Sequence, residues 1–173
     1  MANGKRESAT RRPHRGPGRP VRLDGRAPLI ALDTNILLHA RREELEHHAA
    51  ARRLLRSLAE GSAPWALPWP CVYEFLRVVT HPRVFDPPTP LSTALEDIES
   101  LLASPALVLL GEGPEHRGHL RRTIEAGGAI GNLVHDAHIA ALAIEHGVRE
   151  LWTLDRDFAR FPGLTVRSPF GKA

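Results

Sequence analysis

The stretch Leu29-Ile30-Ala31-Leu32-Asp33-Thr34-Asn35-Ile36-Leu37-Leu38 decides the fold class of this chain of 173 residues. Its first four residues form a short, uninterrupted apolar run, which is typical of a strand buried on both faces of a sheet. A helical pattern follows over residues 35–41. Because a buried strand that leads directly into a helix is the repeating unit of parallel sheets, this stretch indicates an α/β fold.

The rest of the chain repeats this alternation. Further strands are predicted at 65–67, 107–110, 151–153 and 164–166. Helices are predicted at 46–60, 70–80, 115–126 and 134–146, and a helical turn is predicted near 156–160. A further helix reaches about residue 103, and either Thr89 or Ser92 could cap its start. We therefore predict a three-layer α/β/α domain over residues 29–170, with a parallel sheet of four or five strands.

The basic charge of the chain lies in its first segment. The net charge is +3, yet residues 1–28 hold eight Lys or Arg against two acidic residues, and the remainder holds 15 against 18. Residues 1–28 are rich in Gly, Pro and Arg, so we predict a disordered tail there and a short C-terminal tail at 171–173. Residues 15–20 weakly resemble an AT-hook, but we favour a solvated tail, or a start codon assigned too early, over a DNA-binding role.

Composition excludes several classes of protein. Cys71 is the single cysteine, so neither an internal disulfide nor a cysteine-based zinc site can form. No apolar run approaches the roughly 20 residues that a membrane helix needs. The basic first segment lacks the apolar stretch of a secretory signal. We therefore expect a cytoplasmic protein without a membrane partner.

Two carboxylates follow predicted strands. Asp33 comes directly after the strand at 29–32, and Asp155 follows residues 151–154, with Asp157 two residues later. In open α/β sheets, ligands bind outside the carboxyl ends of the strands. The alternative is that Asp33 and Asp155 only cap the helical turns that follow them.

Two further acids lie at unusual places on predicted helices. Asp136 shares an apolar arc with Ile139 and Ala143, where a carboxylate is costly unless it binds a cation or hydrogen-bond donors. Its position in the first helical turn offers an alternative, because helix N-termini favour anions. Glu74 lies at the edge of an apolar face, and an ion pair with Arg77 is its alternative explanation.

Carboxylates that gather at one sheet edge repel each other, so they either share protons or hold a divalent cation. A site made of oxygen ligands suits Mg²⁺ or Mn²⁺. Such ions activate water and neutralise charge during phosphodiester hydrolysis. The acids therefore point to a metal-dependent enzyme that acts on phosphodiester bonds.

Four motifs that carry these acids resemble those of PIN-domain nucleases, and most of all the VapC toxins of VapBC toxin–antitoxin modules. The resemblance spans roughly residues 29–170. Its motifs are Leu32–Leu38 with Asp33, Trp69–Leu76 with Glu74, His135–Ala141 with Asp136, and Trp152–Phe158 with Asp155, followed by Phe161-Pro162-Gly163-Leu164.

This resemblance implies a PIN fold and a Mg²⁺- or Mn²⁺-dependent endoribonuclease that cuts tRNA, rRNA or mRNA. It also implies a homodimer and a VapB antitoxin whose C-terminal segment occupies the active-site groove. Cleavage by water would leave a 5′-phosphate and a 3′-hydroxyl.

The resemblance also implies roles for individual residues. Asp33 and Asp136 would be the main metal ligands, and Glu74 would bind the metal directly or through water, or orient the attacking water. Asp155 would complete the site. The remaining candidates are a reserve acid, Asp157, and three residues that would hold the carboxylates by hydrogen bonds, Thr34, Asn35 and Thr153.

Three alternatives stand beside this hypothesis. One is a PIN-like module that binds nucleic acid without catalysis. A haloacid-dehalogenase-type phosphatase would need Asp rather than Asn35 two residues after the first Asp. The third is a zinc site, but the histidine pairs His116/His119 and His135/His138 lack the Glu of a zinc-binding H-E-x-x-H motif, so zinc is not favoured. For His135, we favour a surface or capping role over contact with the active-site groove.

Overall fold

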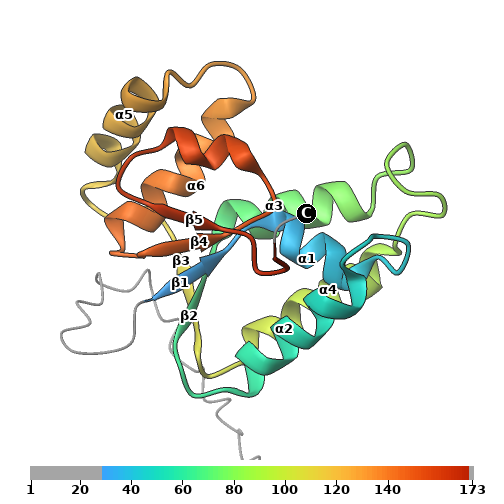
Figure 1. Cartoon of the computed structure of the whole chain (residues 1–173). Helices are drawn as coiled ribbons and strands as arrows, with labels where there is room; N and C mark the ends of the chain where they lie inside the picture. Colours follow the sequence, from blue (N-terminus) through green and yellow to red (C-terminus); the bar gives the residue numbers. More distant parts are fainter. Residues whose placement is uncertain (1–28, 172–173) are drawn as a thin grey trace, which may run out of the picture.

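The computed structural model describes residues 29–171, and its centre is a parallel sheet (Figure 1). The strands are β1 (Ile30–Leu32), β2 (Trp65–Pro68), β3 (Leu107–Leu110), β4 (Glu150–Trp152) and β5 (Thr165–Arg167). They lie in the order β3-β2-β1-β4-β5, and all four neighbouring pairs are parallel. The predicted parallel α/β fold is thus confirmed, with five strands.

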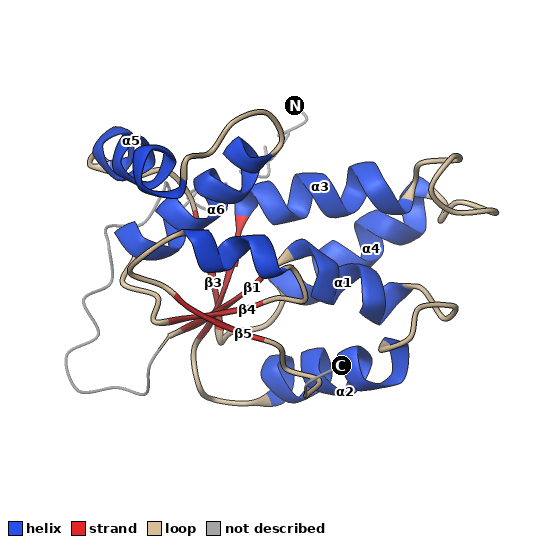
Figure 2. Ribbon diagram, turned by 45° about the horizontal axis from the view of Figure 1, so that its top comes forward, coloured by secondary structure: helices blue, strands red, loops and turns tan. Residues whose placement is uncertain are grey.

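Helices cover the sheet on both sides. They are α1 (Thr34–Arg41), α2 (His48–Glu60), α3 (Trp69–Val79), α4 (Leu91–Leu102), α5 (His116–Gly127) and α6 (Leu133–Glu145), with a short 3-10 helix η1 (Arg156–Arg160). Helices α5 and α6 lie on one side of the strands and α2 on the other (Figures 1 and 2). The result is the predicted three-layer arrangement.

The central strands are apolar because both faces of the sheet are covered. Ala31, Leu32, Trp65 and Leu67 have no exposed surface. Helix α6 is also buried on most sides, over Ile139–Ala143, since its small alanines permit close packing. The first turn of α6 is more exposed, and Asp136 lies there partly buried, directly before the buried part of the helix.

The order of the strands creates a crevice at one sheet edge. From β1 the chain moves to β2 and β3 on one side, and after β3 it crosses to β4 and β5 on the other side. Ligands bind at such a switch point, outside the carboxyl ends of the strands. Here the switch point lies between the ends of β1 and β4.

One predicted feature of the fold is wrong. Neither Thr89 nor Ser92 caps α4, which starts at Leu91 after Pro90 and has no side-chain cap. Thr89 is buried instead, and its hydroxyl accepts a hydrogen bond from Arg42 at 3.1 Å.

The predicted tail at residues 1–28 and the last two residues lie outside the described part of the chain. Within residues 29–171, no helix has the length and apolar character needed to cross a membrane.

Candidate metal centre

Asp33 lies at the end of β1 and accepts hydrogen bonds on both of its carboxylate oxygens. Its Oδ1 accepts from the backbone N–H of Thr34 at 2.7 Å, and its Oδ2 accepts from Asn35 Nδ2 at 2.6 Å and from Thr153 Oγ1 at 2.7 Å. The residue is only 5% exposed. It therefore caps α1, as the alternative explanation from the sequence predicted, and its hydrogen bonds also fix it at the switch point.

Asn35 and Thr153 connect the two strands that meet at this point. Asn35 Nδ2 also donates to Thr153 Oγ1 at 2.8 Å, and Asn35 Oδ1 accepts from the backbone N–H of Leu154 at 3.2 Å. The backbone N–H of Asp155 donates to Thr153 Oγ1 at 2.9 Å. This bracket, which consists of Asn35 and Thr153, fixes the ends of β1 and β4 relative to each other.

Thr34 contributes in a different way from the one expected. Its backbone N–H holds Asp33, whereas its hydroxyl oxygen is buried without a hydrogen-bond partner in the described part of the chain. Cys71 lies beside it, with Sγ at 3.9 Å from Asp33 Oδ1. Burial, followed by the charge of Asp33, raises the pKa of the Cys71 thiol well above its usual value, so Cys71 is an inert core residue.

The other acids come from three separate elements. Glu74 lies on α3, which begins directly after β2, and Asp136 lies in the first turn of α6. Asp155 caps η1 by accepting from the backbone N–H of Asp157 at 2.8 Å. We refer to these acids together with Asp33 as the acidic cluster: Asp33, Glu74, Asp136, Asp155 and Asp157.

The pKa values show that the charges of the acidic cluster act on each other. Burial is the main cause that raises the pKa of Asp136 to about 6, and the charges of Asp155, Asp33, Glu74 and Asp157 add to it. Burial likewise raises the pKa of Asp33 to about 6, with smaller contributions from Glu74 and Asp155, although hydrogen bonds from Thr153 and Thr34 oppose the rise. The four other acids thus lie near enough to Asp136 for their charges to act on it, although among the described residues no three acids of the cluster bring ligand oxygens within 4.8 Å of one another.

The cluster carries negative charge that the described residues do not neutralise. Glu74 pairs with Arg77 at 3.2 Å and Asp157 with Arg160 at 3.2 Å. Within residues 29–171, no Lys or Arg forms an ion pair with Asp33 or Asp136. Since oxygen ligands with excess negative charge suit a hard divalent cation, these residues fit Mg²⁺ or Mn²⁺.

The bracket yields a first prediction. Thr153→Val keeps the shape of the side chain but removes the hydrogen bond that Thr153 Oγ1 donates to Asp33. It also removes the two hydrogen bonds that this oxygen accepts, from Asn35 Nδ2 and from the backbone N–H of Asp155. Because residues behind a metal ligand set its orientation, we expect Mn²⁺ to bind roughly tenfold more weakly, as measured by electron paramagnetic resonance. Thr123→Val, a buried threonine on α5, is the matched control. Unchanged Mn²⁺ affinity in Thr153→Val would show that the bracket does not orient Asp33.

A pocket of about 610 Å³, which we call the basic pocket, is lined by residues of α1, α2, α3 and α4 and by the segments between them, and its acidic lining residues are Glu43, Glu44 and Asp97. Its apolar lining includes Leu37 of α1 and Phe75 of α3, which neighbours Glu74. Its basic lining, which the sequence analysis missed, comprises Arg41, Arg42, His48, Arg52 and Arg56.

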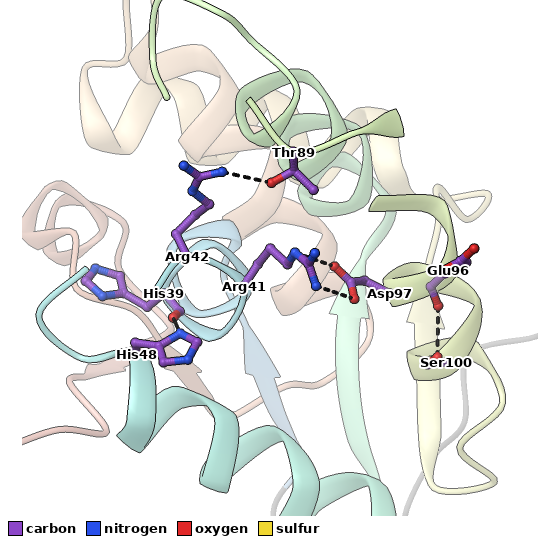
Figure 3. Close-up of polar contacts among 8 residues, drawn as sticks. All are labelled: His39, Arg41, Arg42, His48, Thr89, Glu96, Asp97 and Ser100. Carbon is purple, nitrogen blue, oxygen red and sulfur yellow. Dashed lines mark hydrogen bonds and ion pairs between the residues drawn. The ribbon is translucent and has the colours of Figure 1, made fainter. Parts of the chain in front are cut away.

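Most of these basic side chains are already engaged (Figure 3). Arg41 pairs with Asp97 at 3.3 Å, Arg42 donates to Thr89, and His48 Nδ1 donates to the His39 carbonyl at 3.1 Å. Arg52 and Arg56 are exposed and form no ion pair within residues 29–171. They are therefore the cations available to a ligand in the pocket.

A second group of side chains that could bind a metal lies outside the acidic cluster, and the spacing of the histidines along the sequence did not reveal it. His116 is buried at 5% exposure, and its ring centroid lies 5.0 Å from that of His138. The sequence spacing had paired each of them with a histidine three residues away. The packing of α5 against α6 pairs them with each other.

Comparison with known proteins agrees with this geometry. The family model described as PIN domain matches residues 30–164. Ribonuclease VapC48 of Mycobacterium tuberculosis is 36% identical over 138 residues, which is 80% of this chain and 95% of that protein. Ribonuclease VapC43 of the same organism is 40% identical over 141 residues, which is 82% of this chain and 95% of that protein.

Solved structures show the same fold. The VapBC2 complex of Rickettsia felis, bound to a promoter DNA fragment, matches with a TM-score of 0.58 and 21% identity, over 81% of this chain and 98% of the other. VapC20 of Mycobacterium tuberculosis, described as a toxin that cleaves the sarcin-ricin loop, matches with a TM-score of 0.55 and 15% identity, over 79% and 98%.

Proposed function

The chain belongs to the PIN-domain family and, within it, to the VapC ribonucleases, and from this premise we propose that it is a divalent-metal-dependent endoribonuclease that acts as the toxin of a type II toxin–antitoxin pair. The observation that carries the proposal is the acidic cluster at the switch point of the sheet. Asp33 and Asp136 there have raised pKa values and no cationic partner among the described residues.

The residues in and around the acidic cluster would have different roles in binding the metal ion. Asp33, Asp136, Glu74 and Asp155 would hold Mg²⁺ or Mn²⁺, and Asp157 is the reserve acid. When bound, the ion supplies activation of water and stabilisation of charge on the phosphate. Asn35 and Thr153 keep the Asp33 carboxylate in one orientation.

Glu74 would bind the ion directly or through water, or orient the attacking water. It is half-buried, and its only ion pair in the described part of the chain is with Arg77 on its own helix. Attack of water on phosphorus breaks the P–O3′ bond. The products then carry a 5′-phosphate and a 3′-hydroxyl, since the ribose 2′-hydroxyl takes no part.

The direct test is cleavage of a defined RNA by the purified protein, followed by identification of the new ends. We expect Mg²⁺ or Mn²⁺ to support cleavage, EDTA to stop it, and the new 5′ ends to be substrates for an exonuclease that requires a 5′-phosphate. Products with 2′,3′-cyclic phosphates, or cleavage that EDTA does not affect, would contradict the proposal. RNA binding without cleavage would favour the non-catalytic module instead.

We propose that the basic pocket receives an acidic segment of a VapB-type antitoxin. The support is the apolar floor of the pocket together with the unpaired Arg52 and Arg56 at its wall. The pocket-lining residues Leu37 and Phe75 belong to α1 and α3, the helices that also position Asp33 and Glu74. We propose that an antitoxin segment bound in the pocket reaches toward the acidic cluster along these helices.

The pocket yields a second prediction. The double variant Arg52→Glu/Arg56→Glu is expected to bind the antitoxin roughly tenfold more weakly, with most of the difference lost at high salt, because exposed charges are screened. Isothermal titration calorimetry at two salt concentrations measures both effects. Arg53→Glu is the control, since Arg53 is exposed on the same helix but does not line the pocket. Equal weakening by the control variant would argue against the pocket.

We further propose that the protein acts in the cytoplasm as a homodimer on tRNA, rRNA or mRNA, as its family resemblance implies. One observation supports self-association. Leu91, Leu95 and Leu102 lie along one side of α4 and are exposed by 58%, 42% and 38%. An exposed apolar row of this kind is more typical of an interface than of a free surface.

A further inference from the structure

Three side chains from three different elements converge at a place separate from the acidic cluster. Glu112 lies in the loop after β3, His116 is the first residue of α5, and His138 lies on α6. One ligand atom from each residue lies within 4.8 Å of those of the other two. Residues far apart in the sequence thus present one oxygen and two imidazole nitrogens to a common point.

This point lies on a different side of α6 from the acidic cluster. His138 follows Asp136 by two residues, which corresponds to about 200° around a helix. The acids that raise the pKa of Asp136 all belong to the acidic cluster, and Glu112 is not among them. The two groups of ligands are therefore distinct sites.

His116 is fixed in the form that a metal requires. Its side chain is 6% exposed, and its Nδ1 lies 3.0 Å from Oε2 of Glu145, which is 7% exposed. When Nδ1 donates its hydrogen to this carboxylate, Nε2 of a neutral ring is left to present a lone pair. This Nε2 is buried and has no hydrogen-bond partner within residues 29–171.

His138 shows a similar feature. Its Nε2 is also buried, and its one polar contact in the described part of the chain is the ion-pair contact with Glu112 Oε1 at 3.3 Å. Ligands on a tetrahedral zinc ion, at bond lengths near 2.0–2.1 Å, are separated by roughly 3.3 Å. The spacing of these two atoms therefore matches two corners of a zinc site.

The loop that leads to α5 is shaped around this arrangement. A Cβ atom at Gly113 would collide with Oε1 of Glu145, so the absence of a side chain there leaves room for the carboxylate. The Gly111 carbonyl accepts a hydrogen bond from His146 Nε2 at 2.8 Å, which ties the same loop to the end of α6. Glu145 is thus held in place to orient His116, as carboxylates do behind histidine ligands of metals.

We propose that Glu112, His116 and His138 form a second metal site, specific for Zn²⁺ or a similar transition metal, with Glu145 as the positioning residue behind His116. Two imidazoles and one carboxylate favour such ions over Mg²⁺. The Glu112 side chain is 67% exposed, so the site is open to solvent on that side and leaves a fourth position for water. A bound ion would fasten the loop after β3 and the start of α5 to α6.

The test is titration of the metal-free protein with Zn²⁺, and with Co²⁺ as a spectroscopic probe, in the presence of excess Mg²⁺. Mg²⁺ occupies the acidic cluster and competes poorly for imidazole. We expect one tightly bound equivalent, visible absorption bands of four-coordinate Co²⁺, and a higher melting temperature with Zn²⁺.

Four variants and one control locate the ion. Glu112→Gln, His116→Gln and His138→Gln are each expected to lower the affinity tenfold or more, and Glu145→Gln roughly tenfold. Because Glu112 is exposed, its variant tests the site without disturbing the core, and circular dichroism checks the others. His119→Gln is the control, since His119 lies on α5 outside the group.

Equal Zn²⁺ affinity in wild type and in Glu112→Gln and His138→Gln would overturn the proposal. So would the absence of Co²⁺ bands in the wild type, or Zn²⁺ binding that excess Mg²⁺ displaces, which would place the ion in the acidic cluster.

Discussion

Asp136→Asn is expected to slow RNA cleavage by about a thousandfold or more while the protein keeps its fold. A metal ion supplies several kcal/mol of transition-state stabilisation, and each 1.36 kcal/mol corresponds to a tenfold change in rate. Asparagine keeps the size of the side chain but cannot supply the charge that holds the ion. Asp136 makes no hydrogen bond to the described residues, so the substitution breaks no existing contact.

Single-turnover cleavage at saturating Mg²⁺ measures this effect, and relief of growth arrest on expression gives an independent readout. Asp33→Asn is expected to lose as much activity, but it also disturbs the contact with Asn35 Nδ2, so Asp136→Asn is the cleaner variant. Glu99→Gln, an exposed acid on α4, is the control. If Asp136→Asn cleaves RNA as fast as wild type, the acidic cluster is not the catalytic centre.

The positions of the acids follow largely from local sequence. Asp33 and Asp155 each come after an apolar run, and the carboxyl ends of parallel strands lie at one edge of the sheet, so their placement at the same edge is predictable. Their proximity depends in addition on the pairing of β1 with β4. Asp136 stands out because a carboxylate on an apolar arc is costly to bury. The structure adds that capping and clustering are compatible, since Asp33 caps α1 and belongs to the cluster.

What the sequence does not reveal depends on contacts between distant segments. The contact between Asn35 and Thr153 spans 118 residues and exists only because β1 pairs with β4 in the observed register. The failed prediction for α4 has the same cause, since Arg42 engages the hydroxyl of Thr89 from another helix.

The histidines show this limit most clearly. Spacing within one helix pairs His116 with His119, whereas the packing of α5 on α6 brings His116 to His138. The basic pocket is likewise not visible in the sequence, because Arg52 and Arg56 line the same pocket as Phe75 only in the folded chain. Patterns of period 3.6 report which face of a helix is apolar, but not which helix covers it.

In metal-free buffer at pH 7, the Asp136→Asn protein is expected to melt several degrees above wild type. Burial and the four neighbouring carboxylates raise the pKa of Asp136 to about 6. The ionised side chain therefore destabilises the folded state, and asparagine removes the charge. For a chain of this size, 1 kcal/mol corresponds to roughly 2–4 °C in melting temperature.

The direction of the pH dependence follows from linkage. A carboxyl group with a folded-state pKa above its unfolded value destabilises the fold only where it is ionised, so its effect is complete above about pH 6 and absent below about pH 4. The advantage of Asp136→Asn should therefore disappear as the pH falls through this window. Asp33 adds to the same trend in wild type, because a pKa raised from 3.8 to about 6 corresponds to about 3 kcal/mol.

With Mg²⁺ present, we expect wild type to have a higher melting temperature than Asp136→Asn, the reverse of their order in EDTA. The ion binds the folded wild type and so raises its melting temperature at pH 7, whereas the variant has lost a ligand and responds less. Scanning calorimetry at several pH values, with EDTA or Mg²⁺, measures both effects. Other ionisable groups also make the stability depend on pH, for example Glu44 and Glu150, which have lowered pKa values. Because both proteins contain these groups, their contribution drops out of the difference in melting temperature between wild type and variant. A wild type that melts above Asp136→Asn in EDTA at pH 7 would show that the carboxylates do not repel each other, and the electrostatic basis of the metal site would fail with it.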